Sequence, residues 1–153
     1  MPSIQIYQYF VTNIDGRPVQ GGSLSEARNV TLGDGEVIDR AFKIGTETAV
    51  KVFDKTVDAA LGDFNFLWME TDLDVLVQFT TDAAEDDEYF VVELKGSGTA
   101  GQMGPALILG TDDTQLQDGD VDLFDGTAGT IDEIFVKNQS STEIARVRIV
   151  VAT

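Results

Sequence analysis

Hydrophobic and polar residues alternate along several short stretches of this chain, most clearly between residues 63 and 95. Side chains on a β-strand point to opposite faces with a period of two, so this alternation predicts strands with one buried face. Three runs show it, at residues 64–69, 73–80 and 90–95. We expect these three strands to form an antiparallel meander at the centre of a β-sandwich.

The first run predicts which aromatic side chains are buried. Phe64, Phe66 and Trp68 are two residues apart, so they share one face, while Asn65 and Met69 lie on the other. We expect the three aromatic residues to pack in the core.

Further short runs with β-forming residues extend the pattern to both ends of the chain. They lie at residues 4–12, 36–44, 48–54, 105–110, 121–124, 131–137 and 143–151, and turn residues separate them. The last two are expected to form a closing hairpin. Helical periodicity is almost absent. With about eight to ten short strands, the chain is predicted to be all-β, an antiparallel, jelly-roll-like β-sandwich forming a single domain over residues 1–153.

Residues 17–35 are unlike the rest of the chain. They contain Gly21, Gly22, Gly33 and Gly35 and few large apolar residues. We interpret them as a long loop or a contact arm with one short strand near Val30, because long loops in compact domains usually have a function. The alternative is a loop that packs on its own domain.

Composition excludes several kinds of chemistry. The 153 residues include no Cys and no His, so the chain has no disulfide, no thiolate or His-ligated metal site and no Ser-His-Asp triad. The N-terminal segment does not resemble a signal peptide, and no apolar run is long enough to span a bilayer. We predict that the protein is not an enzyme, with no catalytic residue, no cofactor and no assigned metal ligand.

The net charge of −17 is distributed unevenly. Residues 56–136 hold nineteen Asp or Glu and a single base, Lys95, whereas the flanking residues hold eight acids and nine bases. Such a negative middle repels nucleic acid and anionic lipid, so neither is an expected partner. The acids either keep turns soluble or make a dipolar subunit whose near-neutral ends dock on a partner.

One acidic stretch is a candidate calcium site. Asp118, Asp120, Asp122 and Asp125 fall within residues 118–125, and alternating carboxylates on an extended segment suit oxygen-ligated Ca²⁺. The EF-hand template fails, however, because Leu123 and Gly129 stand where it requires Gly and Glu. A solvated acidic turn is the alternative, so no metal ligand is assigned.

Two other groups of residues have some features of a functional site. Residues 96–101 carry Gly96, Gly98 and Gly101 at dinucleotide-loop spacing, but Pro105 follows too soon for the helix that holds phosphate. We therefore expect a loop between strands. Glu70 beside Trp68 has the apolar neighbours of a catalytic acid, but a glycosidase needs two such carboxylates.

Trp68 has a second interpretation. Together with Tyr7, Tyr9 and Tyr89 it would make a stacking platform for sugars, as in lectins of sandwich type. The alternation instead favours packing of Trp68 in the core.

The end of the chain resembles bacteriophage virion proteins of β-sandwich type. The residues that carry the resemblance are 131–138 (IDEIFVKN), 146–153 (RVRIVVAT) and 73–80, together with the small size and the absence of Cys and His. Capsid decoration (cement) proteins are the most similar group. These are small acidic β proteins, commonly trimeric, that clamp neighbouring major capsid subunits from outside the shell.

The resemblance implies a structural virion protein on the outer capsid surface, made in the host cytoplasm. Its partners would be the major capsid protein and copies of itself, in a homo-oligomer for which a trimer is favoured. Residues 17–35 and the N-terminal strand are the expected docking surface, through strand addition or an apolar patch near the termini. The alternatives are a carbohydrate-binding module, with or without calcium, and a phage tail or head–tail component.

Overall fold

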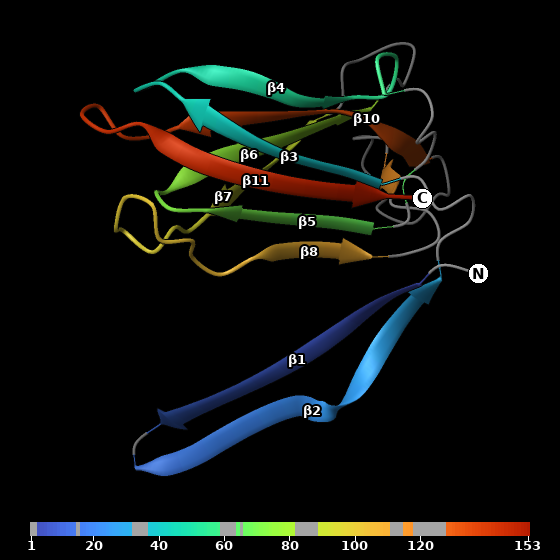
Figure 1. The fold of residues 1–153 in the computed structure, drawn as a ribbon, viewed down its shortest axis with the longest axis vertical. Coiled ribbons are helices and arrows are strands. Elements are labelled where there is room, and N and C mark those ends of the chain that lie inside the picture. The colour runs from blue at the N-terminus through green and yellow to red at the C-terminus, as the bar shows by residue number, and fades with distance from the viewer. Residues whose placement is uncertain are drawn as a thin grey trace.

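The computed structural model describes residues 3–14, 16–31, 37–58, 64, 66–81, 89–110, 115–117 and 128–153. These residues form strands joined by turns, with no helix that would cross a membrane (Figure 1). The strands are β1 (Ser3–Ile14), β2 (Arg17–Thr31), β3 (Val37–Ile44), β4 (Ala49–Asp54), β5 (Phe66–Thr71), β6 (Val75–Thr81), β7 (Tyr89–Leu94), β8 (Leu107–Gly110), β9 (Gln115–Gln117), β10 (Ala128–Asn138) and β11 (Ala145–Ala152).

Eight of these strands form two antiparallel sheets that pack face to face. The first sheet has the order β3-β11-β5-β8 and the second the order β4-β10-β6-β7, while the short β9 pairs with one end of β10. Taken in chain order, these eight strands switch sheets at every step except from β6 to β7. This order is that of a jelly roll, so the predicted β-sandwich and its jelly-roll character are confirmed.

The core lies between the two sheets, where alternate side chains of facing strands meet. Both sheets contribute fully buried residues, which come from β3, β4, β5, β6, β10 and β11. The largest are Phe53, Phe79, Ile44, Leu67, Met69, Ile134 and Ile149. The last strand shows the pattern most clearly, because the side chains of Ala145, Val147, Ile149 and Val151 are buried and those of Arg146 and Arg148 are exposed.

The expectation that Phe64, Phe66 and Trp68 share one buried face is wrong. β5 begins only at Phe66, and it is Leu67 and Met69 that point into the main core. Phe66 and Trp68 lie on the opposite face of the strand, in a second apolar cluster. Phe64 precedes the strand, so the period of two does not apply to it, and it packs edge-on against Phe53 in the main core with ring centroids 5.6 Å apart.

A β-bulge changes the alternation in β4. The pairing with β10 shifts between Ile134 and Phe135, so that Val52 lies at the irregularity. An extra residue in one strand lets two neighbouring side chains face the same way. Val52 and Phe53 are therefore both buried, although simple alternation predicts opposite faces for them.

The predicted meander and the predicted closing hairpin are also wrong. β6 and β7 are neighbours, but β5 belongs to the other sheet, where it pairs with β11 and β8. The last two strands, β10 and β11, lie in different sheets as well. Local alternation identifies a strand and its buried face, but it carries no information about which sheet the strand joins.

The first two strands form a separate hairpin that belongs to neither sheet of the sandwich. β1 and β2 pair antiparallel from Ser3↔Thr31 to Ile14↔Arg17, with an irregularity between Ile6 and Gln8. Figure 1 shows this hairpin projecting beyond β8, away from the stacked sheets. We call it the arm, meaning β1 and β2 together. The sequence predicts a long loop or contact arm with one short strand near Val30 over residues 17–35. Residues 17–31 are instead one long strand, and residues 32–35 lie outside the described residues.

The turn of the arm follows from its sequence. The two residues between Ile14 and Arg17 are Asp-Gly, and Gly16 has a φ of +78°. Two-residue hairpin turns require a positive φ, which glycine adopts without strain, so Asp-Gly is among their preferred sequences.

Candidate functional site

β7 lies at the edge of its sheet and carries an exposed apolar run. Its register places it beside β6, and it pairs with no second strand in the part of the chain that the structure describes. Tyr89, Phe90 and Val91 are 67%, 53% and 43% exposed. An edge strand offers unpaired N–H and C=O groups to another chain, and natural proteins usually protect such an edge with charge or proline.

The side chains of this run face both sides of the sheet. Phe90 is paired with Phe79 and points toward the inter-sheet space, where the two rings stack with centroids 6.4 Å apart. Tyr89 and Val91 point to the outer face. Because β7 is the last strand on this side of its sheet among the described residues, Phe90 stays half exposed, whereas its partner Phe79 is buried.

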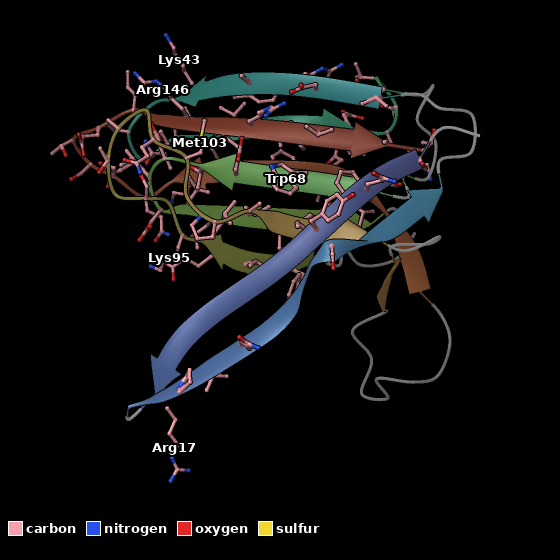
Figure 2. The ribbon with its side chains drawn as sticks, turned by 60° about the horizontal axis from the view of Figure 1, so that its bottom comes forward. Arg17, Lys43, Trp68, Lys95, Met103 and Arg146 are labelled. Carbon is pink, nitrogen blue, oxygen red and sulfur yellow. The ribbon has the colours of Figure 1, made fainter. Side chains whose placement is uncertain are left out.

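The arm offers the second exposed surface. Ser3, Gln5 and Tyr7 of β1 are exposed, and so are the residues around the tip from Gly16 to Gln20. Arg17 extends from the tip, at the point of the arm farthest from the sandwich (Figure 2). The arm and β7 thus both combine an edge that has no partner strand among the described residues with exposed apolar side chains. The edge strand β3 has a single exposed valine, Val37, whereas β7 has three exposed apolar residues in succession.

Charge differs sharply between the arm and the rest of the chain. Residues 3–31 contain two acids, Asp15 and Glu26, and two bases, Arg17 and Arg28, so their formal charge is zero. The whole net charge of −17 therefore belongs to residues 32–153, since residues 1 and 2 carry no charged side chain. The acidic sandwiches of two copies of the chain therefore repel each other. A neutral arm can approach an acidic sandwich without this electrostatic repulsion.

Lys95 leaves a net negative charge at the end of β7, because two carboxylates surround this one ammonium group. Its Nζ donates to Glu93 at 2.7 Å and to Asp74 at 2.9 Å. These hydrogen bonds raise the pKa of Lys95 and lower the pKa of both carboxyl groups. Lys95, the single base of residues 56–136, is therefore part of an exposed ion-pair cluster. Such clusters contribute little stability in water.

The glycine-rich residues 96–101 do not form a phosphate site. The N–H of Gly96 donates to Asp74 Oδ1 at 3.0 Å, that of Gly98 to the Asp72 carbonyl at 3.0 Å, and that of Gly101 to Asp72 Oδ2 at 2.6 Å. A phosphate loop needs such N–H groups to point at the ligand. Here they bind the protein itself, so the predicted loop between strands is confirmed in this region.

Glu70 is engaged in an ion pair, and Trp68 is not brought together with Tyr89. The carboxylate of Glu70 lies 3.5 Å from Arg148 Nη1. This partly buried acidic side chain therefore has a basic partner. Trp68 lies on the outer face of the first sheet, while Tyr89 lies on the outer face of the second. These two aromatic side chains are on opposite sides of the sandwich, so the stacking platform predicted for lectin activity is not assembled.

The predicted calcium segment, residues 118–125, lies outside the described residues. Within the described part of the chain, no group of three or more acidic side chains has the geometry to hold a metal ion. A pocket of about 240 Å³ opens between β3 and β4, beside Phe42 and Val57. Its polar groups already satisfy one another, because Arg40 donates to both oxygens of Asp58 at 3.2 and 2.7 Å.

Sequence reasoning missed the exposed run on β7, although a signal was present. The alternation over residues 90–95 predicts one buried face, and Phe90, Val92 and Leu94 do point inward, opposite the buried Phe79, Val77 and Val75. However, Tyr89, Phe90, Val91 and Val92 are four apolar residues in a row, and a half-buried strand should have a polar residue among them. Loss of the alternation between apolar and polar residues at the end of a strand therefore indicates an edge strand with an exposed apolar surface.

Comparison of the chain with models of known protein families, with curated proteins and with solved structures found no match.

Proposed function

We propose that this chain is a structural protein of a virion, a capsid decoration (cement) subunit that binds the outer surface of the head shell. In this proposal it works as a homo-oligomer, for which a trimer is favoured, and its partners are the major capsid protein and further copies of itself. It has no catalytic role. The resemblance of residues 73–80, 131–138 and 146–153 to phage virion proteins motivates the proposal.

The observation that carries the proposal is the arm. The arm joins neither sheet of its own domain, so its two strands gain no stability from pairing with the sandwich. A two-stranded hairpin on its own is only marginally stable in water. Contact with another molecule would stabilise such a hairpin, and this is the role that we propose for the arm. Its exposed tip, with Arg17 and Val19, is the part that we assign to the shell.

The rest of the domain fits the same role. A jelly roll supplies a rigid body and is a fold that viral capsid proteins use, although the fold alone does not decide function. An acidic body avoids packaged DNA. Many copies bound to a regular shell gain stability by mass action and by multivalent contact, so no deep ligand pocket is needed.

Mass spectrometry of purified particles tests the location. The proposal expects the chain to be stoichiometric in DNA-filled and empty heads and absent from isolated tails. Recovery in tails or connectors alone would show a tail or head–tail component instead, and absence from particles would overturn the assignment to a virion.

Binding to shells that lack the protein tests the arm. Val19→Asp places a charge on the exposed tip, and Val57→Asp places the same charge on the sandwich, where Val57 is exposed at the end of β4. We expect Val19→Asp to weaken shell binding at least tenfold in a sedimentation assay, with Val57→Asp close to wild type. Equal binding by all three proteins would remove the tip from the docking surface.

A further inference from the structure

We propose that the exposed edge of β7 is the acceptor for the arm of a second copy of this chain, with β1 of one copy pairing along β7 of the next. The inference deepens the proposed function, since it names the surface through which the copies associate. Strand addition of this kind uses backbone hydrogen bonds for affinity and apolar side chains for specificity.

The first support is that both edges are open in one subunit. β7 has β6 on one side, and β1 has β2 on one side, and the other edge of each has no partner strand in the described part of the chain. The two elements are not paired with each other within one copy. A neighbouring copy is therefore the natural source of the missing strand.

The second support is the surface that the added strand would cover. Tyr89 and Val91 lie on the outer face of β7, and Phe90 lies on the inner face. The ring of Phe90 stacks on Phe79 and is half exposed. A strand added to this edge would place side chains beside all three. It would also cover the ring of Phe90, which is half exposed beside the buried Phe79.

Charge favours the arm over any other part of a second copy as the occupant. The arm has a formal charge of zero, whereas the body of each copy carries −17. Contact of body with body would therefore add strong repulsion, while contact of arm with body would not. The arm is thus the segment of this chain best suited to lie against the acidic domain of its neighbour.

The lengths are compatible with a second contact at the tip. β7 has 6 residues and β1 has 12. At roughly 3.4 Å per residue, β7 offers an edge of about 20 Å and β1 extends about 40 Å. About half of β1 would pair with β7, which leaves the tip of the arm for the shell.

The absence of Cys from the chain makes a clean cross-linking experiment possible. Three variants with one thiol on exposed residues of β1, Ser3→Cys, Gln5→Cys and Tyr7→Cys, are each mixed with Val91→Cys under oxidising conditions. Residues opposite each other on paired strands are close enough for a disulfide. We expect a mixed dimer between at least one β1 variant and Val91→Cys, which by design joins two copies.

Val37→Cys is the matched control for Val91→Cys. Val37 is also an exposed valine on an edge strand, β3, but it lies in the other sheet. The β1 variants should cross-link with Val91→Cys at least tenfold more than with Val37→Cys. Equal yields with both, or no mixed dimer with Val91→Cys, would overturn the inference.

A second measurement uses charge in place of a thiol. Val91→Lys protects the edge in the way that natural edge strands are protected, and Val37→Lys adds the same charge on β3. We expect Val91→Lys to raise the Kd of self-association at least tenfold in sedimentation velocity, and Val37→Lys to leave it near the wild-type value. An unchanged Kd for Val91→Lys would count against the β7 edge, and circular dichroism confirms that both variants fold.

The outcomes separate this inference from the proposed function. Cross-linking through Val91 in a protein that does not bind shells would leave the arm exchange standing and defeat the virion assignment. Shell binding without any cross-link to Val91 would keep the virion assignment and defeat the arm exchange.

Discussion

Asp72 and Arg146 form a reciprocal clamp between the turn that follows β5 and the start of β11. The backbone N–H of Arg146 donates to Asp72 Oδ1 at 2.7 Å, and the N–H of Asp72 donates to the Arg146 carbonyl at 3.1 Å. The carboxylate is fully buried, and its other oxygen accepts the N–H of Gly101 at 2.6 Å. One acidic side chain thus joins three segments that are far apart in the sequence.

Replacement of this carboxylate should be costly. Asp72→Asn keeps the size of the side chain but turns one acceptor into a donor, which would face the N–H of Arg146 or that of Gly101. A buried donor without a partner costs about 1–3 kcal/mol, and we expect a loss of that size in the free energy of unfolding, measured in urea. The exposed Glu143→Gln should change it by less than about 0.5 kcal/mol. Similar values for the two variants would show that the clamp is not stabilising.

Asn138 plays a comparable part at the end of β10. Its buried amide donates to the carbonyls of Ile44 and Glu143 at 3.1 and 2.8 Å, and its oxygen accepts the N–H of Ser140 at 2.9 Å. Asn138→Ala leaves these three groups without that partner, so thermal or urea unfolding should show a loss of at least about 2 kcal/mol. The exposed neighbour Gln139→Ala is the control, and its effect should be below about 1 kcal/mol.

Asp54 gives a prediction about pH. Hydrogen bonds from Thr56, and then from Lys51, lower the pKa of Asp54 from 3.8 to about 2. A carboxyl group whose pKa is lower in the folded state stabilises the fold above its unfolded pKa, and this contribution is lost as the pH falls toward the folded pKa. Asp54→Asn should therefore be less stable than wild type at pH 6, and the difference should shrink between pH 4 and about 2. Urea unfolding at several pH values measures it, and a difference that grows on acidification would contradict the assignment.

Gly104 is predicted to accept no side chain. A Cβ atom there would lie 2.6 Å from the carbonyl carbon of Gly96 and 2.7 Å from the backbone nitrogen of Ser97. Backbone atoms cannot rotate away, so Gly104→Ala should lower the free energy of unfolding by about 1–3 kcal/mol, as overpacking does. At Gly45 the nearest atom is a side-chain hydroxyl, that of Thr48 at 3.3 Å. Gly45→Ala should therefore cost clearly less in the same urea titration, and an equal cost would refute the steric argument.

The strands were predictable where the chain alternates regularly. Residues 73–80 were assigned as a strand and form β6, and residues 36–44 and 48–54 correspond to β3 and β4. The pattern works there because one face of each strand is buried in a common core, which imposes a period of two on the sequence. It failed at Phe53 and Phe64, where a bulge and a strand boundary interrupt the period.

The candidate site was predictable only in outline. The sequence pointed to residues 17–35 and the N-terminal strand, and these residues contain the arm, but it did not show that they pair with each other. The exposed run on β7 was missed altogether. Phe90 and Val77 occupy equivalent places in their alternating runs, yet Val77 is buried and Phe90 is half exposed, because β6 has a strand on both sides and β7 on one.

Three features follow from local pattern or composition and could be read from the chain before folding: the all-β class, the lack of Cys and His chemistry, and the concentration of charge away from the arm. The membership of each strand in a sheet, the edge position of β7 and the separation of the arm from the sandwich depend on the folded arrangement. The physical reason is that strand pairing joins residues far apart in the chain, as between Thr71 and Val147, and burial depends on those distant neighbours.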